Sequence, residues 1–198
     1  MSYKSYTTKM IENKDFLPLR GNFRQLIAFQ KAECIYDLTV LFTRSFLSSS
    51  DRTVDQMVQA ARSGKQNIAE GCAASTTSRE TEIKLLNVAK ASLQELLLDY
   101  EDYLRINSLS IWTIENPRLA KLRKICIANN DSAFYRELFK KCNNEMVANM
   151  AITLIHQTDV FLRRLIEKAK NDFLNSGGIR EQMTRGRLEY RKSHPDRQ

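Results

Sequence analysis

The stretch VDQMVQAARSGKQNIAEGCAASTTSRETEIKLLNVAKASLQELLLDYEDYL, residues 54–104, holds two amphipathic helical patterns on either side of a short corner. In both patterns apolar side chains return every three or four positions, the spacing of one face of an α-helix. Gly64 lies inside the first pattern, where glycine costs about 1 kcal/mol relative to alanine, so we expect a neighbouring helix to approach it closely. The apolar positions are Val54, Met57, Val58, Ala61 and Ile68 before the corner, and Leu86, Ala89, Leu93, Leu96, Leu97, Tyr100 and Leu104 after it.

Residues that favour helix ends extend this pair into four long helices. Asn22, Asp51 and Ser78 each stand where a side-chain oxygen can accept a hydrogen bond from an unpaired amide of a helix N-terminus. Gly177-Gly178 is a stop signal after the last apolar stripe. Long amphipathic helices with short links predict an all-α fold, an antiparallel up-down four-helix bundle. The expected helices cover residues 22–46, 52–73, 78–106 and 144–175.

An insertion at residues 108–144 separates the third long helix from the fourth. Pro117 suits the first turn of a helix, and a short helix is expected over residues 118–128. Asn and Asp at 129–131 break it. Residues 132–141 form a second short helix, or both segments lead into the last long helix.

A polar leader and a basic tail flank the bundle, which covers residues 22–175. The leader is residues 1–21. The tail, residues 176–198, carries six positive and three negative side chains from Ile179 onward. It is either disordered or a segment that folds onto a partner.

The charge balance favours an anionic partner. The 198 residues include 31 Lys and Arg against 23 Asp and Glu, a net charge of +8 with a pI of about 9.4. Such a surface suits nucleic acid, an acidic protein or a membrane surface. The alternative is a basic protein without a polyanion partner.

Several classes of protein and of chemistry are not supported by the sequence. Its four cysteines form no CxxC pair and are read as reduced, core-filling thiols. No signal-peptide pattern and no apolar run long enough to span a bilayer occurs, so we expect a cytoplasmic protein without membrane contact. His156 has no acidic or histidine partner at helical spacing, and no zinc motif, phosphate loop or nucleophile motif is present. We therefore expect no metal, no cofactor, no small-molecule substrate and no enzyme activity.

The basic clusters are the most informative functional feature. Lys and Arg contact phosphates without reading sequence, and an aromatic such as Tyr190 can stack on a base. Ordinary solvated charge is the competing interpretation. The candidate nucleic-acid-binding residues are Arg118, Lys121, Arg123, Lys124, Arg163, Arg164, Arg180, Arg185, Arg187 and Arg191.

Five segments carry a resemblance to a bacterial four-helix-bundle family first noticed as proteins encoded in intervening sequences of 23S ribosomal RNA genes. The string NIAEG, Asn67-Ile68-Ala69-Glu70-Gly71, resembles the hallmark of its second helix. The similarity covers residues 23–104 and, more loosely, 150–168. The other segments are FQKA at 29–32, IYDLT at 35–39, KLLNVAKASLQEL at 84–96 and GGIREQMTR at 177–185, the last similar to a short suffix found in some members.

This resemblance implies a helical bundle without known catalysis, in which the NIAEG residues are structural. Similar bundles include the accessory protein of diversity-generating retroelements, a basic pentameric barrel that engages a reverse transcriptase and nucleic acid. A homopentamer is therefore the implied assembly, although the insertion at 108–144 departs from the compact form. Together with the charge clusters, the resemblance predicts a homo-oligomer that binds RNA, DNA or a nucleic-acid-processing partner. The alternative is a protein–protein scaffold whose basic tail docks on an acidic protein.

Overall fold

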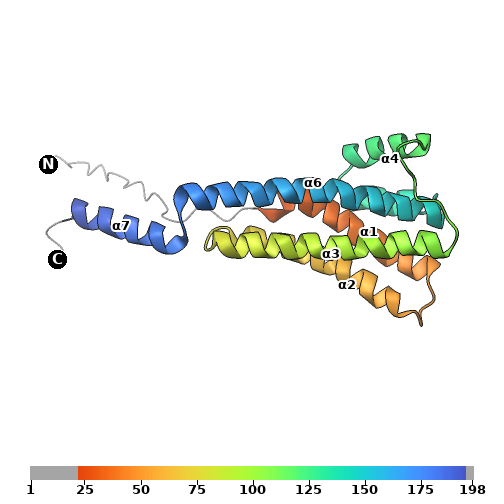
Figure 1. The fold of residues 1–198 in the computed structure, drawn as a ribbon, viewed down its shortest axis with the longest axis horizontal. Helices are drawn as coiled ribbons and strands as arrows, with labels where there is room; N and C mark the ends of the chain where they lie inside the picture. Colours follow the sequence, from red (N-terminus) through yellow and green to blue (C-terminus); the bar gives the residue numbers. More distant parts are fainter. Residues whose placement is uncertain (1–21, 195–198) are drawn as a thin grey trace, which may run out of the picture.

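The computed structural model describes residues 22–194, and every regular element in that range is helical. The all-helical bundle expected from the sequence is therefore confirmed. A short 3-10 turn precedes seven α-helices (Figure 1). The elements are η1 (Phe23–Gln25), α1 (Ile27–Phe46), α2 (Arg52–Ala74), α3 (Arg79–Ile106), α4 (Pro117–Ala128), α5 (Ser132–Phe139), α6 (Asn144–Ser176) and α7 (Ile179–Ser193).

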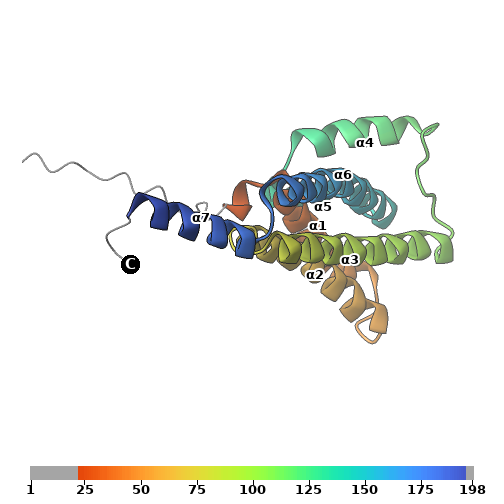
Figure 2. The same cartoon turned by 60° about the vertical axis from the view of Figure 1, so that its left-hand side comes forward.

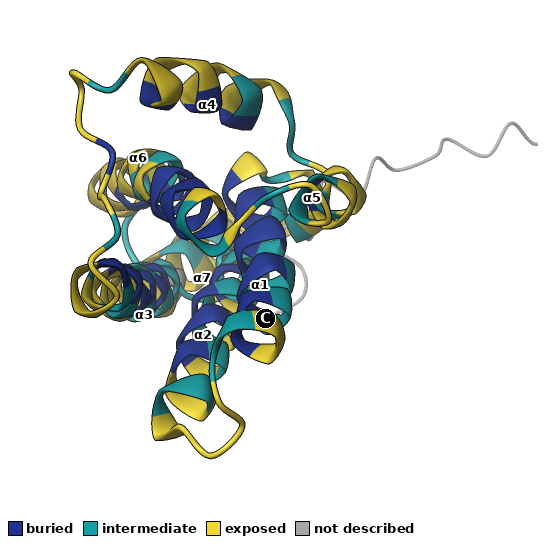
Figure 3. Cartoon of the chain, turned by 90° about the vertical axis from the view of Figure 1, so that its right-hand side faces the viewer, coloured by how far each residue is buried: buried dark blue, intermediate teal, exposed yellow. Residues whose placement is uncertain are grey.

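The four longest helices form the bundle. Helix α1 packs against α2 and α6, and α3 packs against the same two helices. The link between α1 and α2 lies at the opposite end of the bundle from the link between α2 and α3 (Figure 1). Viewed along the bundle, the buried residues face one another in its centre (Figure 3). The apolar face predicted for residues 86–104 is buried throughout, from Leu86 to Leu104.

Side-chain caps set most of the helix boundaries. The Asp51 carboxylate accepts from the Thr53 amide at 2.9 Å, and the Ser78 hydroxyl accepts from the Thr81 amide at 3.2 Å. These two predicted caps are confirmed. Asn22 caps only the 3-10 turn, because the extended backbone of Leu26 separates that turn from α1. The first helix therefore begins at Ile27 and not at residue 22, which corrects the prediction.

Gly64 lies at a close approach of α2 and α3. A Cβ atom at this position would lie 2.7 Å from Leu93 Cδ2 and 2.8 Å from Leu93 Cγ. The glycine removes that collision, so the Leu93 side chain fills the space. The close helix contact expected at Gly64 is confirmed.

The insertion forms two separate helices on the outside of the bundle (Figure 3). Helix α4 lies on α6, and α5 lies on α1. The two predicted short helices are thus confirmed, with the second ending at Phe139 instead of residue 141. The loop before α4 is held by Trp112, whose backbone amide donates to Asn149 Oδ1 at 2.7 Å and whose indole donates to Glu145 Oε1 at 2.7 Å.

Helix α7 leaves the end of the bundle (Figures 1 and 2). Gly177 has a φ of 71°, a left-handed conformation that redirects the chain after α6. Residues 179–193 are helical, so a wholly disordered tail is the wrong alternative. The predicted leader, residues 1–21, and the tail end, 195–198, lie outside the described residues. Among the helices described, none has the length and apolar character needed to cross a membrane.

Candidate nucleic-acid interface

Helix α4 presents a row of uncompensated positive charge. Its sequence, PRLAKLRKICIA, contains four cations and no acid. Asn116 caps it and Pro117 occupies its first turn, so the helix begins at a fixed place. Leu119, Leu122 and Cys126 recur at helical spacing and are buried. Burial of this face turns the four cationic side chains outward, and all are exposed: Arg118, Lys121, Arg123 and Lys124.

These four cations are available to an external anion. Within residues 22–194, none of them forms an ion pair. The Arg118 guanidinium lies 5.9 Å from the Trp112 ring centroid, an internal contact that leaves its charge unneutralised. The backbone of α4 is tied to α6 through Gln157 Nε2, which donates to the Arg123 carbonyl at 3.3 Å.

Two arginines of α6 extend the row. Arg123 and Val160 line the same shallow hollow between α4 and α6. Arg163 and Arg164 follow Val160 by three and four positions, so they continue that side of α6 beyond the end of α4. Arg163 pairs with Asp159 at 3.0 Å, and Arg164 lies 5.9 Å from the Phe161 ring centroid. We call this set the basic face: Arg118, Lys121, Arg123, Lys124, Arg163 and Arg164.

The other four candidates belong to a separate surface. Helix α7 extends from one end of the bundle, whereas α4 lies over the opposite half of α6 (Figure 1). The α7 arginines are exposed, and no ion pair between described residues involves them. The ten residues that the sequence grouped by charge alone therefore divide into six on the basic face and four on α7: Arg180, Arg185, Arg187 and Arg191.

The NIAEG string contributes packing between α2 and α3. Asn67 Nδ2 donates to the Ser63 carbonyl at 2.9 Å and to the Ser63 hydroxyl at 3.2 Å. That hydroxyl shares a 2.8 Å hydrogen bond with Ser92 of α3. Ile68 and Gly71 are buried against the partner helix. Glu70 is exposed and has no ion pair within the described range, so it contributes nothing visible to this packing.

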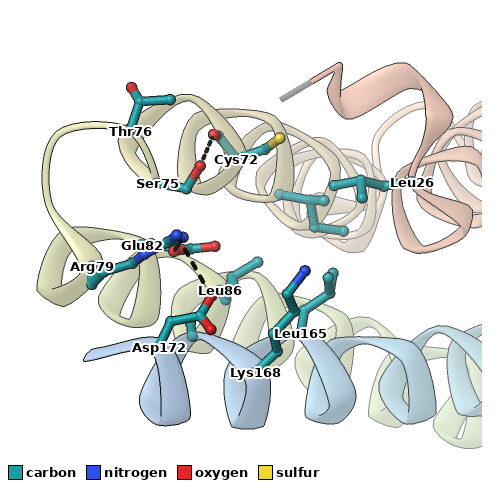
Figure 4. Close-up of a pocket in the computed structure, with 12 residues that line it drawn as sticks. Leu26, Cys72, Ser75, Thr76, Arg79, Glu82, Leu86, Leu165, Lys168 and Asp172 are labelled. Carbon is teal, nitrogen blue, oxygen red and sulfur yellow. Dashed lines mark hydrogen bonds and ion pairs between the residues drawn. The ribbon is translucent and has the colours of Figure 1, made fainter. Parts of the chain in front are cut away.

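A small cavity of about 230 Å³ lies where α2, α3 and α6 meet at the α7 end of the bundle (Figure 4). Leu86 and Leu165 form part of its apolar floor. Across it, Arg79 pairs with Glu82 at 2.8 Å and with Asp172 of α6 at 3.5 Å. Three of the charged side chains of this cavity thus bind one another, and Arg79 links α3 to α6. Lys168 of α6 also lines the cavity.

The buried thiols show no signs of a nucleophile. Burial raises the pKa of Cys34 to about 12 and that of Cys126 to about 11. Both thiols are therefore protonated at neutral pH, and a thiolate is the reactive form. Beside them Lys31, 1% exposed, donates from Nζ to the Cys126 carbonyl at 2.6 Å and so caps the C-terminus of α4. Burial lowers the pKa of Lys31.

No cluster of three or more His, Cys, Asp or Glu side chains able to hold a metal occurs in residues 22–194. His156, the histidine considered in the sequence, is exposed beside α4. Comparisons with protein-family models, with curated proteins and with solved structures find no match to this chain. The resemblance noted in the sequence accordingly stays a prediction.

Proposed function

We propose that this protein is a non-catalytic, homo-oligomeric helical bundle that binds nucleic acid, or a nucleic-acid-processing partner, through its basic face. The observation that supports this function is α4: twelve residues with four exposed cations, no acid and no ion pair to any described residue. Three buried side chains and the Lys31 hydrogen bond hold that helix in place. Because the backbone of this charge row is already fixed, only its side chains have to be ordered when it meets a phosphate backbone.

The resemblance favours five subunits and the cytoplasm of a bacterium as the setting of this function. In a homo-oligomer, identical basic faces act together, and weak contacts at each face add through effective concentration.

Phosphate contacts give the proposal a quantitative signature. If the four α4 cations each meet a phosphate, the logarithm of the association constant falls with the logarithm of salt with a slope of about −3.6. Between 50 and 200 mM salt that slope corresponds to a loss of roughly 150-fold. Sequence preference is not expected, because phosphate contacts carry none.

Fluorescence polarisation with labelled single- and double-stranded RNA and DNA tests the proposal. The double variant Lys121→Gln/Lys124→Gln should reduce the salt slope by about 1.8 and weaken binding to all sequences alike. Lys84→Gln is the matched control, because Lys84 is an exposed cation of α3 that already pairs with Glu80 at 2.7 Å. Equal binding by the wild type and the α4 variant at 50 mM salt contradicts the proposal.

A second candidate function is a protein–protein scaffold. It is favoured by α7, which exposes Met183, Leu188 and Tyr190 by 56%, 53% and 52% among its arginines. Such a mixed surface suits an acidic protein better than a phosphate backbone. Deleting residues 179–198 separates the two functions: loss of a captured protein with unchanged nucleic-acid affinity supports the scaffold.

A further inference from the structure

A hollow with acidic and apolar walls lies at the end of the bundle opposite α7. It has a volume of about 450 Å³, within the usual size of ligand pockets, roughly 300–1,000 Å³. It opens between the end of α1, the start of α2 and the end of α3. We call it the acidic hollow and define it by Phe46, Leu47, Asp51, Met57, Asp99, Asp102 and Ile106.

The carboxylates of this hollow are incompletely paired. Asp99 Oδ2 is buried and has no hydrogen-bond partner among the described residues. Burial raises the pKa of Asp99, and the nearby charges of Glu95 and Asp102 raise it further. Arg105 pairs with Asp102 at 2.6 Å on the exposed rim, while Asp51 caps α2 through Thr53. A cation that entered the hollow would therefore relieve an unsatisfied acceptor and a repulsion between like charges.

Helix α7 carries the complementary surface. At 100° per residue, Arg180, Arg187 and Arg191 lie on one face, because they are separated by seven and four positions. Met183 and Tyr190 form an adjoining apolar stripe, since they are also seven positions apart. These residues are exposed and lie off the bundle (Figure 1). Three arginines beside an apolar stripe match acids beside an apolar wall in both charge and character.

The two surfaces cannot meet within one molecule. Arg79, which pairs with Asp172 near the α7 end, precedes Asp99 by twenty positions of α3, or about 30 Å along the helix axis. Helix α7, with 15 residues, is only about 22 Å long and points away from the bundle (Figures 1 and 2). The acidic hollow of a second copy of the chain is within reach of α7.

We propose that α7 of one molecule docks into the acidic hollow of a second copy, with Arg187 and Arg191 facing the carboxylates and Met183 on the apolar wall. This inference rests on the homo-oligomeric part of the proposed function and names its interface. The contact is heterologous, since it joins two different surfaces. It therefore builds a ring if its rotation closes and a filament if it does not.

Complementation between two defective variants tests this interface. The tail variant Arg187→Glu/Arg191→Glu lacks a working α7, and the hollow variant Asp99→Asn/Asp102→Asn lacks the two carboxylates that α7 would meet. By light scattering each should be a monomer of about 22.9 kDa at concentrations where the wild type assembles. Mixed at equal amounts, they should form a complex of two subunits and no larger species, because one intact hollow meets one intact tail.

Arg185→Glu/Lys192→Glu is the matched control. These residues lie on the opposite side of α7 from the proposed contact, so the same charge reversal should leave the wild-type assembly intact. Circular dichroism establishes that each variant is folded. A chain that combines Arg187→Glu with Asp102→Lys exchanges the charges across the contact, and it should recover part of the assembly lost in the tail variant.

The outcomes separate this interface from the proposed function. A wild type that assembles while both variants also assemble overturns the docking of α7 and leaves the homo-oligomer standing. Two monomeric variants that stay monomeric when mixed likewise overturn a head-to-tail contact. A wild type that is monomeric up to about 100 μM overturns both the interface and the homo-oligomer, while polarisation assays report nucleic-acid binding independently.

Discussion

Replacing Gly64 with alanine should destabilise the bundle, although alanine is the better helix former. The added Cβ would stand 2.7 Å from Leu93 Cδ2, against an optimal carbon–carbon separation of about 3.5–4.0 Å. Leu93 is 2% exposed, and because its Cγ is also in collision at 2.8 Å, rotation of the side-chain end does not remove the clash. Overpacking of this kind costs about 1–3 kcal/mol, and the helix propensity returns about 1 kcal/mol. The net expectation is a loss of up to about 2 kcal/mol.

The coupling between Gly64 and Leu93 is measured by urea unfolding of the wild type, the two single alanine variants and the double variant. In a Leu93→Ala background, which itself costs about 2–5 kcal/mol, Gly64→Ala should become stabilising, because its collision partner is gone. Gly71→Ala is the matched control on the same helix, since a Cβ there meets its nearest atom, Leu86 Cγ, at an ordinary 3.4 Å. It should be neutral or mildly stabilising. The close approach would be refuted if Gly64→Ala raised the free energy of unfolding of the wild type by as much as it raises that of the Leu93→Ala protein.

Three further predictions concern a cap, a loop anchor and a buried thiol. Ser78→Ala removes the cap of α3 and should lower the free energy of unfolding by about 1 kcal/mol in urea, whereas Ser78→Asp should retain the stability. Glu145→Ala removes the acceptor of the Trp112 indole and should cost about 1.5–3 kcal/mol, with a change in the emission of the chain's single tryptophan. Stability should fall as the pH rises above about 9, because the unfolded Cys34 thiol ionises there while the folded one, with a pKa of about 12, keeps its proton. Cys34→Ala should flatten that decline, and an unchanged pH profile would contradict the buried, protonated thiol.

The fold was largely predictable because its determinants are local. The 3.6-residue spacing of Leu86, Leu93 and Leu97 is visible in sequence, and so are the caps at Asp51 and Ser78. The error at the start of α1 has a local cause of another kind. The backbone of Leu26 is extended, so the 3-10 turn capped by Asn22 does not continue into α1. Across this break the Phe23 ring packs edge-on against the Phe29 ring, with 4.8 Å between the ring centroids.

The candidate site was only partly predictable because charge spacing along a chain does not give position in space. Lys121 and Lys124 were found by their cluster, and their exposure follows from the burial of α4's other face. The candidate cations divide between the basic face and α7 because of where α4 packs on α6. No local sequence pattern encodes that position. Lys31 shows the same limit: its partner, the Cys126 carbonyl, is 95 positions away.

Lys31 also links the bundle to the basic face. A buried ammonium is costly unless its protons are bound, and here one of them meets a carbonyl that the end of α4 leaves free. Tyr135 of α5 donates to the Asn129 carbonyl at 2.9 Å, and Arg136 of α5 pairs with Asp37 of α1 at 2.6 Å. Helix α5 therefore holds the loop that follows α4 and is itself tied to α1. The four cations of α4 therefore stand on a helix whose far end is anchored in the core of α1. Held in this way, α4 places a charged surface on the outside of the four long helices (Figure 3).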